Sequence, residues 1–166
     1  MIIAIANQND AARAAVAAHL ARLRARSGHT VTLIDTAART VSGRELVAEL
    51  ERLRSRRCDI VIDTAGRDSA DNRAALIAAR LAVVPLAPSQ ADLAGQYALI
   101  ARLNAARMFN PGLRVLFVLV GDADAAELAA VRAYVAHVMS ATLAHTVLHA
   151  GANGDMESLY HEVFTH

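Results

Sequence analysis

The chain of 166 residues contains no lysine and no tryptophan, and it has a single cysteine. All 17 of its basic residues are therefore arginine, which excludes any site that requires the compact ammonium group of a lysine. The single cysteine, Cys58, excludes a disulfide within the chain and a cysteine metal cluster. Because Cys58 directly precedes the apolar run "DIVID", we expect a buried, unreactive thiol.

Aromatic residues and net charge are also scarce. Aromatic side chains make up 4% of the chain, and 17 basic residues face 16 acidic ones. A balance this close to neutral does not favour bulk DNA or an anionic membrane as a partner. The apolar runs are shorter than the roughly 18 residues of a membrane span, and the opening "MIIAIA" lacks the basic residues of a signal peptide. We therefore expect a cytoplasmic protein with no membrane partner.

Short β-branched runs alternate with longer alanine- and leucine-rich segments along the whole chain. The expected strands are 2–6, 30–35, 59–63, 81–86, 114–120 and 141–148. The segments between them have helical periodicity, and Leu46, Leu50 and Leu53 mark one face of the second helix. Continuously apolar strands separated by helices are typical of a parallel sheet covered on both faces. We predict a doubly wound α/β fold with a mainly parallel sheet, forming one domain over residues 1–166.

Aspartates stand where several of these strands end. Asp35 and Asp63 close two strands in the same "IDT" motif, and Asp122 follows a third. Ligands of doubly wound sheets bind at the carboxyl ends of the strands. A lone aspartate there is commonly the cap of a turn or helix. Two "IDT" motifs at consecutive strand ends, the second within "DTAGRDS", favour a binding site.

Five segments, taken in order, resemble the ParA/MinD family of P-loop partition ATPases. They are "MIIAIANQ" (1–8), "GHTVTLIDT" (28–36), "CDIVIDTAGRDS" (58–69), "VVPLAPSQADL" (83–93) and "NPGLRVLFVLV" (110–120). The resemblance implies the P-loop NTPase fold, binding of ATP with Mg²⁺, and partners that include a second copy and another protein. It also implies a role in plasmid or chromosome segregation, or in positioning a cellular cargo.

The phosphate-binding loop of that family is degenerate in this chain. The family has KGGVGKT[ST], whose glycines let backbone amides surround phosphate, whose second lysine contacts it, and whose hydroxyl holds Mg²⁺. The corresponding residues 9–15 read "NDAARAA". Asn9 replaces the signature lysine, Asp10 begins the stretch that replaces the glycines, Arg13 falls at the phosphate lysine, and Ala14 replaces the hydroxyl. Without glycine the left-handed backbone of a phosphate loop is strained, and Asp10 would repel a polyphosphate.

Two further positions depart from the family, while part of its switch region is retained. Ala37 stands where the family has the acid that positions the attacking water, so Asp35 is at most vestigial. Gly121 and its neighbour follow the fifth strand where the family has an adenine-reading asparagine. Asp63 is retained at the position of the acid that holds Mg²⁺ through water, as is Gly66. We interpret the chain as a pseudo-ATPase scaffold with no confidently assigned catalytic residue and no expected cofactor.

Two interpretations of the altered loop remain open. In the first, the chain is an atypical ATP-binding switch or ATPase in which Arg13 still holds phosphate and Asp63 holds Mg²⁺. The nucleotide-binding residues would then be Asn9, Asp10, Arg13, Asp63 and Gly66. In the second, Arg13 is an ordinary exposed residue on the first turn of a helix.

A basic cluster offers a third function. The run "RLRSRR" (52–57) places Arg54, Arg56 and Arg57 at the end of a helix, where basic residues interact favourably with the helix dipole. The same residues would form a patch for non-specific DNA binding. The last helix, "DMESLYHEVF", is acidic on its polar face and does not resemble a basic amphipathic membrane anchor.

Two remaining features have structural explanations. Ser89, with Asp92 three residues later, fits the N-terminal cap of a helix over 89–108. Five of the seven histidines lie in the last third of the chain, but none has the glutamate and second histidine of a zinc-binding helix. We expect these histidines at the surface or in caps.

Overall fold

The computed structural model describes residues 1–7, 10–38, 42–91 and 93–165. Within these ranges six strands alternate with six α-helices, and one short 3-10 helix, Pro88–Gln90, follows the fourth strand. The strands are β1 (Ile2–Ile5), β2 (Val31–Asp35), β3 (Asp59–Asp63), β4 (Leu81–Leu86), β5 (Arg114–Val120) and β6 (Ala141–Leu148). The helices are α1 (Asp10–Arg26), α2 (Gly43–Ser55), α3 (Ala70–Ala78), α4 (Leu93–Phe109), α5 (Ala125–Val135) and α6 (Asn153–Phe164). All six predicted strands are confirmed.

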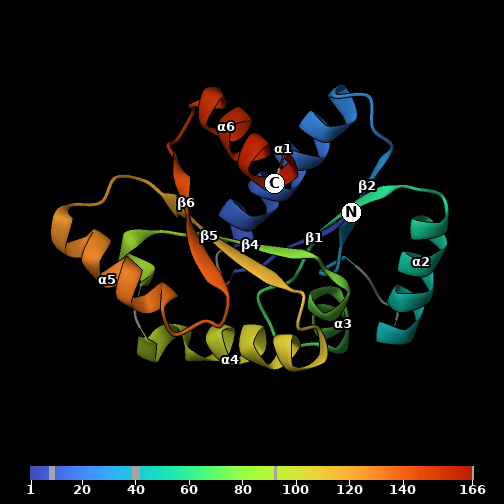
Figure 1. The fold of residues 1–166 in the computed structure, drawn as a ribbon, viewed down its shortest axis with the longest axis horizontal. Coiled ribbons are helices and arrows are strands. Elements are labelled where there is room, and N and C mark those ends of the chain that lie inside the picture. The colour runs from blue at the N-terminus through green and yellow to red at the C-terminus, as the bar shows by residue number, and fades with distance from the viewer. Residues whose placement is uncertain (8–9, 39–41, 92, 166) are drawn as a thin grey trace.

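The six strands form one parallel sheet in the order β2-β3-β1-β4-β5-β6 (Figure 1). This order reverses direction beside β1, as expected of a doubly wound fold. In the register of the sheet, Asp63 at the end of β3 lies between Ile5 of β1 and Asp35 of β2. Because all the strands are parallel, their carboxyl ends share one edge, and Asp35 and Asp63 lie next to each other along it.

The helices cover both faces of the sheet and bury a separate core on each. Helices α1 and α6 pack on one face, where Val16 and Leu20 of α1 meet Leu159 of α6. Helices α2 to α5 cover the other face, where Leu46, Leu50 and Leu53 of α2 are buried as predicted. Figure 1 shows α1 and α6 together on one side of the strands, with α3 and α4 on the opposite side. Double coverage explains why the central strands β1, β4 and β5 are almost continuously apolar.

Two helices begin at caps that their local sequence provides. The Ser69 side chain accepts a hydrogen bond from the backbone amide of Asn72 at 3.2 Å, which caps α3. Asp124 and Glu127 form a reciprocal capping box on α5, with bonds of 2.8 and 3.0 Å. Each cap satisfies amide groups that have no partner inside the helix.

The predicted cap at Ser89 is wrong. Ser89 lies inside the 3-10 helix, where the Gln90 side chain accepts a bond from the Ala87 amide at 3.1 Å. Helix α4 begins later, at Leu93, and Asp92, the other half of the predicted cap, lies outside the described residues. Gln90 therefore caps the 3-10 helix, and the α-helix predicted to begin at Ser89 begins at Leu93.

Among the described residues, no helix is both long enough and apolar enough to cross a membrane.

Candidate functional site

The segment expected to bind phosphate is mostly helical. Helix α1 begins at Asp10, five positions after the end of β1 at Ile5. The alanines of "NDAARAA" favour helix, and they lie in the first turns of α1. Asn9 lies outside the described residues, and the side chain of Asp10 is not described.

Arg13 lies on the first turns of α1, and its guanidinium is buried against the sheet. Its Nε donates a hydrogen bond to Oδ1 of Asp63 and forms an ion pair with it. Its Nη1 donates to the backbone carbonyl of Asn7 at 3.2 Å. The two charged side chains are 4% and 8% exposed. The prediction that Arg13 is an exposed residue is therefore wrong, because the helix directs its side chain to the end of β3.

Asn7 and Thr64 connect the strand ends around this ion pair. The side-chain amide of Asn7, which is buried, donates to the Pro85 carbonyl in β4. The Thr64 hydroxyl donates to the Ile5 carbonyl in β1 at 2.8 Å. Both bonds join neighbouring strands at the point where the backbone hydrogen bonds between them end. They therefore hold the carboxyl ends of β1, β3 and β4 together beside the ion pair of Arg13 and Asp63.

A buried network fixes the segment that follows Asp63. The Thr36 hydroxyl donates to Oδ1 of Asn72 at 2.7 Å and accepts from the Ala65 amide at 2.8 Å. The Asn72 side-chain amide donates to the carbonyls of Ala65 and Arg67, at 2.7 and 2.6 Å. Thr36, directly after β2, and Asn72 of α3 thereby hold backbone groups of the switch-like residues 64–69. Buried polar groups satisfied in this way favour one backbone conformation.

Asp35 does not join the ion pair. Its side chain is exposed, and Oδ1 accepts a hydrogen bond from the Ala37 amide at 2.8 Å. This is the turn-capping role that a lone aspartate often has. Gly66, the other retained residue, is half-buried. Of the predicted nucleotide-binding residues, the structure thus brings Arg13 and Asp63 into contact.

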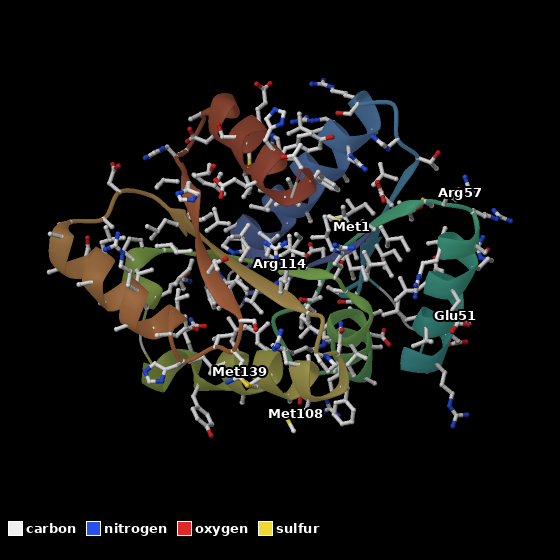
Figure 2. All side chains as sticks on the ribbon, in the orientation of Figure 1. Met1, Glu51, Arg57, Met108, Arg114 and Met139 are labelled. Carbon is white, nitrogen blue, oxygen red and sulfur yellow. The ribbon has the colours of Figure 1, made fainter. Side chains whose placement is uncertain are left out.

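The opposite edge of the sheet carries a basic cleft of about 700 Å³. It is lined by Arg54 from the last turn of α2, Arg80 just before β4, and Arg114 at the start of β5. All three arginines are exposed, and within the described part of the chain none forms an ion pair. Of the predicted DNA-binding residues, Arg54 lines this cleft, and Arg56 and Arg57 do not. Figure 2 shows Arg57 beyond the end of α2, well apart from Arg114.

One histidine forms a surface cluster near the ends of β5 and β6. The ring of His149 contacts Asp155 through Nδ1 at 2.8 Å and Asp122 through Nε2 at 3.1 Å. The hydrogen bond to Asp155, followed by that to Asp122, raises the pKa of His149 above its usual value. Within the described ranges, no group of three or more histidine, cysteine or acidic side chains is arranged to hold a metal.

Solved structures identify the fold. Cobyrinic acid a,c-diamide synthase from Mycobacterium smegmatis, solved with bound ADP and magnesium, has a TM-score of 0.66 at 14% identity, covering 100% of this chain and 97% of its own. A plasmid partition protein from Borrelia burgdorferi has a TM-score of 0.63 at 12% identity, covering 99% of this chain and 97% of its own. No protein-family model and no curated protein sequence matches the chain. The fold is of the ParA/MinD type.

Proposed function

We propose that the chain is a ParA-like partition or positioning protein that has lost ATPase function and serves as a protein-binding scaffold. Its process would be plasmid or chromosome segregation, or the positioning of a cellular cargo. The likeness to a plasmid partition protein over nearly the whole of both chains supports the first part. The arrangement at the carboxyl edge of the sheet supports the second.

The observation that carries this proposal is the buried ion pair of Arg13 and Asp63. Asp63 stands at the position of the Mg²⁺-holding acid in the family that the sequence resembles, and here the guanidinium of Arg13 supplies its positive partner. For Mg²⁺ to take that place, Arg13 would have to leave, and a buried charge would lose its partner. Breaking a buried pair in this way costs about 3–5 kcal/mol. The residues present therefore do not fit a nucleotide with Mg²⁺.

A second part of the site supports the same conclusion. A phosphate loop needs backbone amides that converge on one point and a hydroxyl for the metal. In this chain α1 already begins at Asp10, and Ala14 is an exposed alanine. The helix N-terminus that remains is covered on its inner side by Arg13, whose donors are directed to Asp63 and to the Asn7 carbonyl.

Calorimetric titration with ATP and with ADP, each with Mg²⁺, tests this proposal. We expect no binding heat at millimolar nucleotide for the wild-type chain, and none for Arg13→Gln. The other interpretation, an atypical switch in which Arg13 and Asp63 hold the nucleotide, predicts micromolar binding that Arg13→Gln weakens. Micromolar binding, or Mg²⁺-dependent ATP turnover that Asp63→Asn abolishes, would overturn the pseudo-ATPase proposal.

A second candidate function is association with DNA, and the basic cleft favours it. Three arginines from separate elements, Arg54, Arg80 and Arg114, line one concave surface. Arginine side chains that have no acidic partner are suited to contact successive phosphates, and each phosphate contact adds about 0.9 to the salt dependence of binding. The cleft thus provides local positive charge that the near-neutral composition does not show.

Retention on duplex DNA at several salt concentrations tests this second candidate. We expect binding that weakens steeply with salt, and a slope that falls by about 2–3 when the three cleft arginines are replaced by alanine. The matched control is Arg56→Ala with Arg57→Ala, which removes neighbouring exposed arginines outside the cleft and should change the slope less. Retention that is independent of salt, or equal losses in both variants, would contradict the assignment to the cleft.

A further inference from the structure

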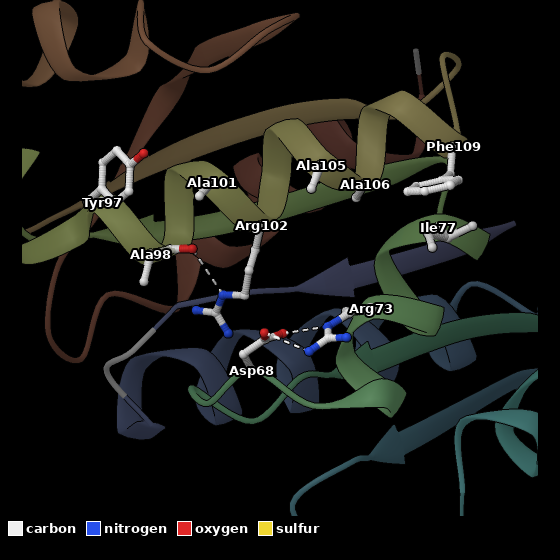
Figure 3. A pocket seen from close by; sticks show the side chains of 10 residues that line it. All are labelled: Asp68, Arg73, Ile77, Tyr97, Ala98, Ala101, Arg102, Ala105, Ala106 and Phe109. Atoms are coloured by element: carbon white, nitrogen blue, oxygen red, sulfur yellow. Dashed lines mark hydrogen bonds and ion pairs between the residues drawn. The ribbon is translucent and has the colours of Figure 1, made fainter.

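The outer face of α4 carries large exposed apolar side chains beside a groove. Tyr97, Met108 and Phe109 are 71%, 75% and 76% exposed, and Ile77 of α3 is 39% exposed. The groove between α3 and α4 has a volume of about 460 Å³. Figure 3 shows Tyr97 at one end of α4, with Phe109 and Ile77 close to each other at the other end.

The floor of the groove is made of small residues, so the helix can approach another closely. Ala98, Ala101, Ala105 and Ala106 line it between the two aromatic ends (Figure 3). The residues Tyr97, Ala101, Ala105 and Phe109 are spaced four apart and therefore form one continuous row along the helix surface. The side chains of this row are large and aromatic at its two ends and small in the middle.

This order makes the row complementary to itself. An antiparallel second copy, related by a two-fold axis level with residue 103, would place Tyr97 beside Phe109 of the second copy. The same operation would place Ala101 beside Ala105 of the second copy, so the small residues meet where the helices are closest. Superimposing two rows of this kind requires a crossing angle of about −50°, which is the commonest angle for packed helices in globular proteins. A two-fold interface uses the same patch on both subunits, as this pairing does.

The exposed area is sufficient for the centre of such an interface. Taking about 200 Å² for each large side chain when fully exposed, the four large residues leave on the order of 500 Å² of apolar surface. That is at the upper end of the largest apolar patch on a typical monomer, about 300–600 Å². With the alanines and a polar rim it approaches the roughly 800 Å² that each partner buries in a specific interface.

The charges of the groove lie to one side of the row. Asp68 and Arg73 neutralise each other through two hydrogen bonds of 2.9 and 2.8 Å. Arg102 donates to the Ala98 carbonyl at 3.3 Å, and its guanidinium points towards Asp68 (Figure 3). The row itself is therefore uncharged, and these three side chains form a polar rim.

We propose that the α4 face, defined by Tyr97, Ala101, Ala105 and Phe109 with Ile77 of α3, is the contact surface of a homodimer. The dimer packs α4 of each copy against α4 of the other, so that the two α4 helices cross at the alanines and Ile77 of α3 lies at the edge of the contact. None of these residues belongs to the cluster around Arg13 and Asp63. The pairing therefore needs no nucleotide and is independent of the pseudo-ATPase proposal.

Molecular mass as a function of concentration tests this dimer, by light scattering or sedimentation. We expect a micromolar equilibrium between 17.6 kDa and twice that mass without nucleotide. Tyr97→Glu or Phe109→Glu should raise the dissociation constant about 100-fold or more, because central aromatic residues dominate interfaces. Val47→Glu, at an apolar residue of α2 that is 43% exposed, is the matched control and should leave the dimer intact. A chain that stays monomeric, or a dimer that resists both glutamates, would overturn the proposal.

Cysteine cross-linking tests the register. Cys58 is buried, so introduced thiols are expected to dominate the reaction. When Ala101→Cys is mixed with Ala105→Cys, the mixed disulfide should form faster than either like-with-like product. In the proposed register these two positions face each other, and their Cα atoms would lie at the separation of about 4–7 Å that a disulfide requires. Preferential like-with-like products would refute this antiparallel register.

Discussion

The ion pair of Arg13 and Asp63 makes a quantitative prediction about stability. Both side chains are almost fully buried, at 4% and 8% exposure, so removing either charge takes this ion pair from the other in a poorly solvated site. We expect Arg13→Met and Asp63→Asn each to lower the free energy of unfolding by about 3–5 kcal/mol. This is a large part of the total of about 5–15 kcal/mol for an ordinary domain.

The double variant separates the pair from the individual side chains. Arg13→Met combined with Asp63→Asn leaves no buried charge in the pair, so we expect it to cost at least about 2 kcal/mol less than the sum of the single variants. Urea unfolding followed by circular dichroism at neutral pH measures all four free energies, provided that the dependence on urea concentration stays the same.

The exposed ion pair of Arg73 and Asp68 is the matched control. Its side chains are 63% and 51% exposed, so water screens the pair. Its double-mutant cycle should therefore give a much smaller coupling energy than the cycle of Arg13 and Asp63, and added salt should reduce it further. If Arg13→Met costs less than about 1 kcal/mol, or if the Arg13 and Asp63 variants are simply additive, the reasoning from burial is refuted.

Three other side chains give independent predictions. The Tyr134 hydroxyl is buried without a partner among the described residues, so Tyr134→Phe should raise the free energy of unfolding by about 1 kcal/mol. Burial raises the pKa of Tyr134 to about 12, and stability that is present below pH 10 should fall as pH rises towards 12 in the wild type but less in the variant. The pKa of His149 should fall more in Asp155→Asn than in Asp122→Asn, measured by NMR titration, because the bond to Asp155 is the larger cause of its rise. The stabilisation from this cluster should be complete below the ordinary histidine pKa and be lost as pH rises through the raised pKa of His149. Asn72→Ala should cost about 2–4 kcal/mol in urea unfolding, since it removes the bonds of the Asn72 side chain to two backbone carbonyls and to the Thr36 hydroxyl. A loss below about 0.5 kcal/mol would contradict the role of the network.

The strands could be predicted from the sequence because each is a short β-branched run covered on both faces. The same pattern identified Leu46, Leu50 and Leu53 as core residues of α2, since helical spacing fixes which side chains share a face. These are local properties, and packing in the folded chain reinforces them. The parallel order of the sheet follows from the alternation of strands and helices.

The environment of the site residues could not be predicted in the same way. The sequence places Arg13 on the first turns of a helix, but its burial depends on Asp63, which lies 50 positions further along the chain. Nothing local to either residue indicates that contact. The roles of Asn7 and Asn72 were missed for the same reason, since Asn7 bonds to the Pro85 carbonyl, 78 positions along the chain, and Asn72 accepts from the Thr36 hydroxyl, 36 positions away. Asn72 follows a serine cap in "SADN", which indicates a helix start but not a buried amide.

The basic cleft shows a similar limit of sequence analysis. A run such as "RLRSRR" is visible as a cluster, whereas Arg80 and Arg114 are isolated in the sequence and meet only because β4 and β5 are neighbours in the sheet. Arg114 donates its backbone amide to the Arg80 carbonyl at 3.1 Å. Positive charge that is dispersed along the chain is therefore concentrated by the register of the strands.

NMR observation of the Arg13 side-chain Nε–H group tests most directly whether the site can hold a nucleotide. This group is buried and donates to Asp63. We therefore expect a slowly exchanging resonance at neutral pH, absent in Arg13→Gln, that does not move when ATP with Mg²⁺ is added at millimolar concentration. A resonance that exchanges as fast as those of exposed arginines, or one that shifts on addition of ATP with Mg²⁺, would contradict the account.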